Sequence, residues 1–435
     1  MKRILAVCIA GLFSGGALAA DLMAVYQEAL ANDAKFSAAR AQFEAGQEKV
    51  VQGRAGLLPQ IGLAADTTYT DADFRTRVPP GSSSPSYNSN GYGVQLTQPL
   101  FRWQNWVQYK QGELQTALSE TQFGIARQDL VLRVAEAYFN VLIAQDALAA
   151  VDQLRAAAAE QLELARTSFE VGTVTITDVH EAQSRFDLAS AQEIAAANQL
   201  EVARQTLAQI IGKEPGGLSG LREGVALQRP QPDNIADWVA AAESGSFGVQ
   251  ARQLAREIAV REVERQRAGH LPTIDVVASH GVNHRPQPST DRAEASAIGV
   301  QLNMPLYAGG RVSSVTREAA ALRVKADAEL DDARRSAALA ARQAWLGVTS
   351  GMAQVRALEA ARVSSTSALE ANKLGYEVGV RINIDVLNAQ TQLADTLQQL
   401  SRARYDTLLA QLRLKAAAGT LGEDDVQAIN ALLAP

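Results

Sequence analysis

The sequence is poor in cysteine, in basic residues relative to acidic ones, and in long hydrophobic runs. Cys8 is the only cysteine among 435 residues, so the rest of the chain has no disulfide, thiol chemistry or cysteine-based metal site. The 41 basic residues do not balance the 47 acidic ones, and the net charge is −6. An acidic chain is a poor partner for nucleic acid.

The N-terminus has the pattern of a secretory signal. Lys2 and Arg3 precede an apolar stretch from Ile4 to Leu18, and Ala17-Leu18-Ala19 fits the A-x-A cleavage pattern. We expect residues 1–19 to be a signal peptide. No later run of 18 or more apolar residues predicts a transmembrane helix. An exported chain of this kind is periplasmic, secreted, or inserted in an outer membrane as β-strands.

Motifs for catalysis or metal binding are also lacking. We find no Ser/His/Asp arrangement, paired catalytic carboxylates or phosphate loop in a supporting context. His280 and His284 are four residues apart, but they fall on an expected strand and loop rather than a helix, so we expect no metal site. The sequence predicts no enzyme and no cofactor.

What the chain does contain is an internal repeat. FEVG (Phe169–Gly172) and YEVG (Tyr376–Gly379) align with a shift of 207 residues, and the same shift aligns Gly212 with Gly419. GLLPQI (Gly56–Ile61) matches GHLPTI, and GVQLTQPLF (Gly93–Phe101) matches GVQLNMPLY. Self-similarity at a long period is the signature of repeated structural units. We expect one repeat over 20–212, a linker over 213–232 and a second repeat over 233–435.

Each repeat contains two segments that alternate with period two. In the first, Ile61, Leu63 and Ala65 alternate with polar or small residues, and the second repeat shows the same pattern. The polar segments Pro79–Asn90 and Arg285–Glu294 are expected to be loops between the paired strands.

These strands have two interpretations. They could form two small hairpins packed on helices with their apolar faces inward, or they could span a membrane as part of a barrel. Four strands cannot close a barrel, and open strand edges are not tolerated in lipid. The membrane interpretation therefore requires several copies of the chain to share one barrel.

The remaining sequence predicts long helices. Residues 104–169 contain no proline and only two glycines. After the FEVG segment, ten positions from Val179 to Ile210, spaced by three and four residues, carry nine apolar residues. A sustained seven-residue repeat indicates a left-handed coiled coil. We expect long antiparallel coiled-coil hairpins whose tips lie at the two VG-containing segments.

Together these features resemble the TolC family of outer-membrane export channels. The resemblance rests on the export signal, the tandem halves, the LLPQ- and HLPT-led strands, the QPLF and MPLY strand exits and the two VG tips. It covers essentially the whole chain after the signal, and it points to the non-lipidated branch because no cysteine begins that chain.

The resemblance implies a mainly α fold with β: a homotrimer with a twelve-stranded barrel in outer-membrane lipid and an α-helical tunnel extending into the periplasm. It implies a passive channel that receives proteins or small toxic compounds from an inner-membrane ABC or RND-type transporter and a periplasmic adaptor protein. The linker and the C-terminal segment would form an equatorial belt around the tunnel. The alternative is a periplasmic coiled-coil spacer or adaptor without a pore.

The tips supply helix ends. Gly172 can end a helix in the left-handed conformation, and Gly379 repeats it. Asp178 is expected to cap the following helix, with Glu181 completing a capping box. The resemblance implies that these tips also dock the adaptor; the residues concerned are Val171, Gly172, Thr173, Val378, Gly379 and Val380.

The resemblance further implies that polar tip residues hold the periplasmic entrance shut. Carried over by position, Tyr376 would face Asp178, and Arg381 would face Thr177. Asp385 matches an acidic ring at the narrowest constriction, whereas Asn388 stands where the family often has a second aspartate. This chain should then have a ring of three carboxylates rather than six.

Three aromatic residues follow the second strand of the first repeat. Trp103, Trp106 and Tyr109 could form an interfacial aromatic belt. Ordinary packing where the strands meet the helices would explain them equally well.

Overall fold

The computed structural model describes residues 20–434 apart from 78, 223 and 288, so the expected signal peptide lies outside the described residues. The chain divides into two compact units, each built from both repeats. One unit contains the sheet and comprises residues 41–123 and 248–333. The other contains the helical hairpins and comprises residues up to 40, 124–247 and from 334 onward.

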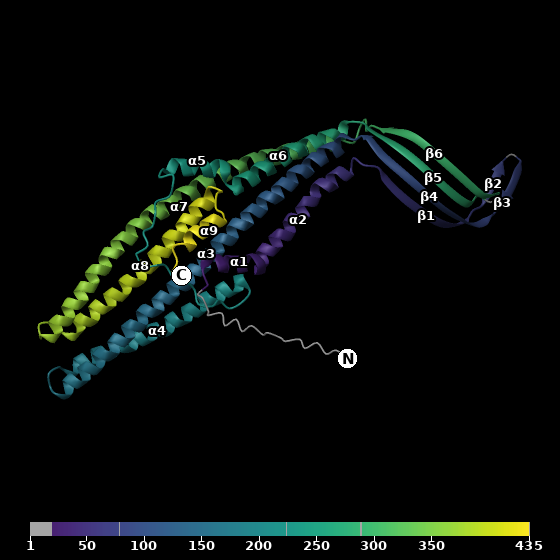
Figure 1. The fold of residues 1–435 in the computed structure, drawn as a ribbon. Helices are drawn as coiled ribbons and strands as arrows, with labels where there is room; N and C mark the ends of the chain where they lie inside the picture. Colours follow the sequence, from purple (N-terminus) through teal and green to yellow (C-terminus); the bar gives the residue numbers. More distant parts are fainter. Residues whose placement is uncertain (1–19, 78, 223, 288, 435) are drawn as a thin grey trace, which may run out of the picture. The chain divides into compact units, whose positions relative to one another are not determined.

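Helices make up most of the chain (Figure 1). They are α1 (Leu22–Asn32), α2 (Ala34–Ala55), α3 (Trp103–Glu170), α4 (Ile176–Ile211), α5 (Ile235–Gly245), α6 (Phe247–Arg267), the short 3-10 turn η1 (Ala268–His270), α7 (Arg311–Glu377), α8 (Asn383–Ala417) and α9 (Glu423–Asn430). The expected long helix over 104–169 is confirmed by α3, and α7 repeats it.

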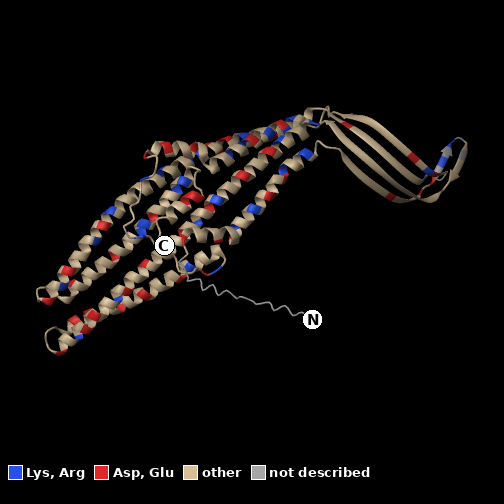
Figure 2. Cartoon of the chain, in the orientation of Figure 1, with Lys and Arg blue, Asp and Glu red and all other residues tan. Residues whose placement is uncertain are grey.

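The sheet unit contains four long antiparallel strands in the order β1-β4-β5-β6. They are β1 (Gln60–Asp71), β4 (Ser86–Phe101), β5 (Thr273–Gln287) and β6 (Thr290–Asn303). A separate small hairpin, β2 (Phe74–Arg77) with β3 (Pro80–Ser83), lies between β1 and β4 in the sequence. Figure 2 shows that charged residues are sparse along the four long strands.

The two expected loops are largely strand, and that expectation was wrong. β4 begins at Ser86 and β5 continues to Gln287, with only a short turn before β6. Asn88, Asn90 and His284 lie opposite residues of neighbouring strands. Polar composition suggested loops, but main-chain pairing extends the hairpins because their outer ends can be polar without losing ladder hydrogen bonds.

The apolar faces of the strands are not packed into a small core. Ile61 is 71% exposed and Val300 is 69% exposed. The interpretation of two hairpins with their apolar faces inward is therefore wrong for the residues that the structure describes. A sheet with an exposed apolar face is typical of a surface that meets lipid.

In the hairpin unit the coiled-coil prediction is confirmed. All ten seam positions of α4 from Val179 to Ile210 are buried or half-buried, and so are the ten matching positions of α8 from Val386 to Ala417. Near the first tip, Leu162 and Ala165 of α3 pack around Ala182 of α4. Recurrent alanine lets the helix axes approach closely, and burial of this stripe stabilises the hairpin.

The repeat also organises the ends of these hairpins. Gly212 ends α4 with φ +77°, and Gly419 follows α8 with the same φ. A Cβ on Gly212 would meet Asn32 at the end of α1, and a Cβ on Gly419 would meet Gly245 at the end of α5. Each hairpin thus ends against a short helix from its own repeat, α1 or α5.

The two ends of the described chain, Ala20 and Ala434, meet the linker in the same unit. Ala20 donates its backbone N–H to Gly217, and Tyr138 donates its hydroxyl to the carbonyl of Ser219 at 2.7 Å. Ala434 donates to Gly220 in turn. Burial raises the pKa of Tyr138 well above its usual range, so its hydroxyl remains a donor. The linker therefore ties the N-terminal segment to the C-terminal one.

One described helix, α3, contains an 18-residue window apolar enough to cross a membrane. More than half of that window, 56%, is buried inside the protein. Val134, Tyr138 and Leu142 of α3 are fully or almost fully buried. The core of the hairpin unit therefore accounts for this apolar stretch.

Candidate functional site

The first tip connects α3 to α4 through a Schellman motif. Gly172 has φ +79° and donates its N–H to the carbonyl of Phe169 at 2.9 Å. Thr173 donates its N–H and its hydroxyl to the carbonyl of Ser168, both at 2.9 Å. Glycine suits this left-handed position because it has no Cβ.

The second tip, between α7 and α8, repeats this backbone. Gly379 has φ +76° and donates to Tyr376 at 3.0 Å, while Val380 donates to Gly375 at 2.8 Å. The two VG segments therefore end their helices in the same way. The left-handed conformation of both glycines confirms their expected role as helix ends.

The helix starts after the two tips differ. Thr175, not Asp178, is the N-cap of α4, and Asp178 is the acidic residue three positions later. One Asp178 carboxylate oxygen accepts from the Thr175 backbone N–H and from its hydroxyl, both at 2.8 Å. The T-x-x-D pattern was present in the sequence and could have identified this arrangement. The expected roles of Asp178 as cap and Glu181 as its partner were wrong.

At the second tip the corresponding cap is Ile382, which has no side-chain acceptor. Asp385 therefore has no cap hydroxyl to bond, as Asp178 has in Thr175. Its carboxylate lies 3.5 Å from the Arg381 guanidinium instead. Both side chains are partly exposed, so the pair contributes ~0.5 kcal/mol. The aspartates at matching positions therefore have different partners.

Gly375 explains how Arg381 reaches this position. A Cβ on Gly375 would lie 2.7 Å from Cγ of Arg381. The matching residue of the first tip is Ser168, and the residue matching Arg381 is Val174. The arginine stem thus lies over a glycine that only the second tip has, and sequence comparison of the two tips could have identified it.

The four expected gate residues are divided between the tips. Among the described residues, no hydrogen bond or ion pair joins Tyr376 to Asp178 or Arg381 to Thr177 within one chain. Thr177 is exposed, and Tyr376 is half-buried. Each charged member of the set is instead bonded within its own tip.

Asn388 occupies the position at which the resemblance implies a second aspartate. Its side chain connects the two hairpins. Its Oδ1 accepts from the Arg185 guanidinium of α4 at 3.1 Å. Arg185 is half-buried at this contact. No local pattern could reveal this contact, because the partners are 203 residues apart.

The tips also expose apolar side chains. Val171 and Val378 are exposed, and Val380 is 78% exposed. Thr173 and the two tip glycines are exposed as well. Small apolar residues at the ends of helical hairpins form a surface that another protein can cover.

The three aromatic residues lie in the first two turns of α3. Trp103 and Trp106 are exposed, and Trp103 donates its indole N–H to Glu264 at 3.2 Å. The Lys110 ammonium lies 5.4 Å from the Trp106 ring centroid and 5.2 Å from that of Tyr109. The two exposed tryptophans suit an interfacial belt, while the bond from Trp103 to Glu264 also packs the junction.

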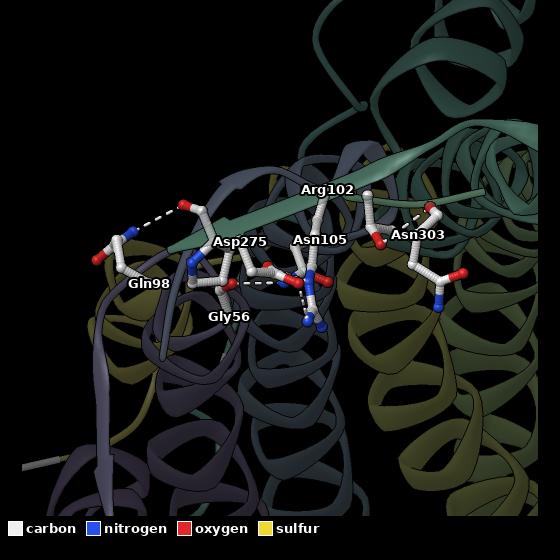
Figure 3. A network of polar contacts seen from close by, with 8 residues as sticks. Gly56, Gln98, Arg102, Asn105, Asp275 and Asn303 are labelled. Atoms are coloured by element: carbon white, nitrogen blue, oxygen red, sulfur yellow. Dashed lines mark hydrogen bonds and ion pairs between the residues drawn. The ribbon is translucent and has the colours of Figure 1, made fainter. Parts of the chain in front are cut away.

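The same junction contains an ion pair that the sequence did not predict. Arg102, just after β4, makes two bonds of 2.7 and 2.6 Å to the carboxylate of Asp275 in β5 (Figure 3). Asp275 is buried, so its charge is balanced by a bidentate partner. Gln98 and Asn105 add hydrogen bonds to the carbonyls of Leu57 and Gly56.

The two histidines lie in β5. The ring Nδ1 of His280 is 2.8 Å from the hydroxyl of Ser296. Over the described residues, no group of three or more His, Cys, Asp or Glu side chains could hold a metal ion.

A sheet with an apolar outer face, joined to long helical hairpins with specialised tips, defines an outer-membrane channel protein of the barrel-and-coiled-coil class. The chain belongs to the outer membrane efflux protein family, whose model matches residues 25–213 and 238–420. The two matched stretches fall one in each half of the chain.

Relatives match over nearly the whole length. The chain is 34% identical to the outer membrane protein TolC of Vibrio cholerae, covering 99% of this chain and 98% of that protein. It is 33% identical to TolC of Escherichia coli, covering 99% and 89%. It is 33% identical to the alkaline protease secretion protein AprF of Pseudomonas aeruginosa, covering 95% and 88%.

Solved structures share the fold at lower identity. The Campylobacter jejuni CmeC outer membrane channel gives a TM-score of 0.82 at 16% identity, over 94% of this chain and 88% of that one. The outer membrane protein VceC of Vibrio cholerae gives 0.78 at 20% identity, over 92% and 96%. The protein is thus a passive channel of the outer membrane and not an enzyme.

Proposed function

We propose that the protein works as a homotrimer in which three four-stranded sheets close one twelve-stranded barrel. The supporting observation is the sheet itself. β1 and β6 each pair on one side only in the part of the chain that the structure describes. Since unpaired strand edges are not tolerated in lipid, copies of the chain must satisfy them.

The helical hairpins would continue the barrel as a periplasmic tunnel. An inner-membrane ABC or RND-type transporter and a periplasmic adaptor would deliver proteins or small toxic compounds to it. Relatives named for efflux and for protease secretion support both substrate classes. The exposed valines of the tips, with Gly172, Thr173 and Gly379, would dock the adaptor.

The tips would also form the gate. Tyr376 would bond Asp178, and Arg381 would bond Thr177, when neighbouring hairpins are drawn together at the entrance. The contacts within each tip support this proposal, because both charged groups already lie at the tips and Arg381 is paired there with a partly exposed carboxylate. A docking partner could then exchange one set of bonds for the other.

Asp385 would supply the ring of carboxylates at the narrowest point. With Asn388 one turn further, three copies would place three carboxylates there. The contact with Arg381 supports a coupling between gate and ring, since any rearrangement that removes Arg381 leaves the Asp385 charge free to attract cations.

The channel is tested by extraction and reconstitution. Protein purified from membranes in detergent should run as a heat-sensitive trimer and conduct ions in planar bilayers. A monomer without conductance would refute the proposed function. Pull-down through the native tips, compared with a Val378→Asp, Val380→Asp variant, would identify the adaptor and test where it docks.

A further inference from the structure

One side-chain contact joins the two helical hairpins near their tips and has no part in the proposed gate. Arg185 of α4 donates from Nη2 to Oδ1 of Asn388 in α8 at 3.1 Å. Both helices belong to the same compact unit. Asn388 lies one turn beyond Asp385, so the Arg185 charge is held within roughly 10 Å of the carboxylate proposed for the constriction, inside one Debye length.

The surroundings of Arg185 hold its side chain in place. Arg185 is half-buried. It lines a small cleft together with Leu188 and Ala189 of α4 and with Leu387 and Thr391 of α8. Arginine lays its methylene stem against such a surface while the charged end remains in polar surroundings. The guanidinium is therefore positioned between the hairpins by both its stem and its hydrogen bond.

The repeat shows that this arginine belongs to one hairpin only. With the shift of 207 residues, Arg185 corresponds to Gln392 of α8, and Asn388 corresponds to Glu181 of α4. The coiled coil does not require a cation at this position, because a neutral amide occupies the matching place in the second hairpin. The charge of Arg185 therefore calls for an explanation other than helix packing.

The first turns of α4 and α8 carry charges that nearly balance. Residues 176–186 and 381–393 contain five charged side chains, which are Asp178, Glu181, Arg185, Arg381 and Asp385. Three carboxylates against two guanidinium groups leave one net negative charge per chain. Loss of Arg185 would double that net charge.

Asn388 and Arg185 together reverse the charge at this position. An aspartate there would add a negative charge, whereas the amide adds none and the guanidinium bonded to it adds a positive one. Charges around a narrow pore act together on an ion inside it, since low-dielectric walls concentrate their field. Arg185 would therefore weaken the attraction of cations to the constriction and reduce the repulsion of anionic groups.

We propose that Arg185 sets the charge selectivity of the periplasmic entrance. Its guanidinium, held by Asn388, offsets the ring of Asp385 carboxylates. Anionic compounds and acidic polypeptide segments then pass a constriction that would otherwise favour cations. The inference rests on the proposed function in that the constriction lies at Asp385 of an assembled channel.

Ion selectivity in planar bilayers tests the role of Arg185. Under a potassium chloride gradient, Arg185→Gln should move the reversal potential toward that of potassium. It should also tighten block by lanthanum(III) ions about tenfold, because every copy loses one positive charge. Arg185→Lys keeps the charge and should leave both values nearly unchanged. The matched control is Arg204→Gln, which removes a half-buried arginine from the same helix about 28 Å away.

The bond to Asn388 is tested by combining substitutions. Asn388→Asp alone places a carboxylate beside Arg185, which offsets its charge, so block should tighten only about twofold. In the Arg185→Gln background the same change should tighten block about tenfold, because the new carboxylate has no cationic partner. Equal effects in the two backgrounds would overturn the pairing.

A cysteine variant separates charge from folding. Cys8 is the only native cysteine and lies in the expected signal peptide, so Arg185→Cys can be labelled in the assembled channel. A neutral methanethiosulfonate reagent and its aminoethyl analogue give side chains of similar size that differ by one positive charge. The aminoethyl label should weaken block by lanthanum(III) relative to the neutral label. Equal block with both labels would overturn the role of the charge.

The outcomes separate this inference from the proposed function. A conducting trimer whose block responds to Asp385→Ala but not to Arg185→Gln would overturn the role of Arg185 and leave the channel and its acidic ring intact. A conducting trimer whose block responds to neither change would overturn the acidic ring as well. A protein that does not conduct would overturn the channel together with this role.

Discussion

The two hairpin tips share one backbone and differ in what their aspartates hold. At the first tip Asp178 bonds the backbone and hydroxyl of Thr175 and so stabilises its own helix. At the second tip Asp385 lies beside Arg381, whose stem passes over Gly375. A repeated structural element can therefore keep its backbone fold while one copy replaces a helix cap with an ion pair between side chains.

The largest expected effect comes from removing the two proposed gate residues of the second tip. Arg381→Ser with Tyr376→Phe should raise single-channel conductance several-fold and sensitise cells to large antibiotics. At about 0.5 kcal/mol per link and six links, two from each of three copies, the closed entrance would lose ~3 kcal/mol, which shifts the population on the order of a hundredfold. Val174→Ser at the matching position of the first tip is the control. Unchanged conductance in an assembled trimer would refute the gate.

A substitution at Gly375 should reproduce part of that effect without touching the arginine. Gly375→Ala places a Cβ against Cγ of Arg381 and should displace the whole side chain, away from Asp385 and from Thr177 of a neighbouring hairpin alike. Conductance should rise, though less than in the double variant. Ser168→Ala is the matched change at the first tip and should leave conductance as it is. Equal effects at both tips would contradict the asymmetry.

The acidic ring can be tested in both directions. Asp385→Ala should weaken block by multivalent cations by about tenfold, because the carboxylates that attract them are gone. Asn388→Asp should strengthen block, since it restores a second carboxylate one turn away. Titrating block in planar bilayers measures both. Persisting block after Asp385→Ala would place the constriction elsewhere.

The smallest effect concerns the caps. Thr175→Ala should destabilise the first hairpin by ~1 kcal/mol, because the capping box is lost. Ile382→Thr should stabilise the second by ~0.5 kcal/mol and draw Asp385 away from Arg381. Hydrogen exchange at the starts of α4 and α8 would report both. No change at α8 would mean that Asp385 prefers the arginine.

The sequence predicted what local patterns determine. Period-two alternation gave the strands, the seven-residue repeat gave the coiled coils, and glycine at matching positions gave the tips. It placed the strand ends wrongly, because the polar residues of Ser86–Asn90 pair through their backbone. It also placed the N-cap three residues too late, although Thr175 and Asp178 form a readable pair.

Contacts between distant segments could not be predicted in the same way. Arg185 with Asn388 and Arg102 with Asp275 join residues far apart in the chain. Neither pair produces a recognisable sequence pattern within one helix or strand, because each partner alone resembles an ordinary surface charge or amide. Only the internal repeat relates distant segments, because matching residues of the two halves occupy matching positions, as Gly172 and Gly379 do at the tips.

The β2–β3 hairpin makes the connection of the first strand pair different from that of the second. β1 and β4 are separated by this extra hairpin, whereas β5 and β6 are joined by a short turn. An epitope or fluorophore inserted at Gly81 would therefore label each chain once, in this additional hairpin. Stepwise photobleaching of single particles would then count the copies in the proposed barrel while it remains in a membrane.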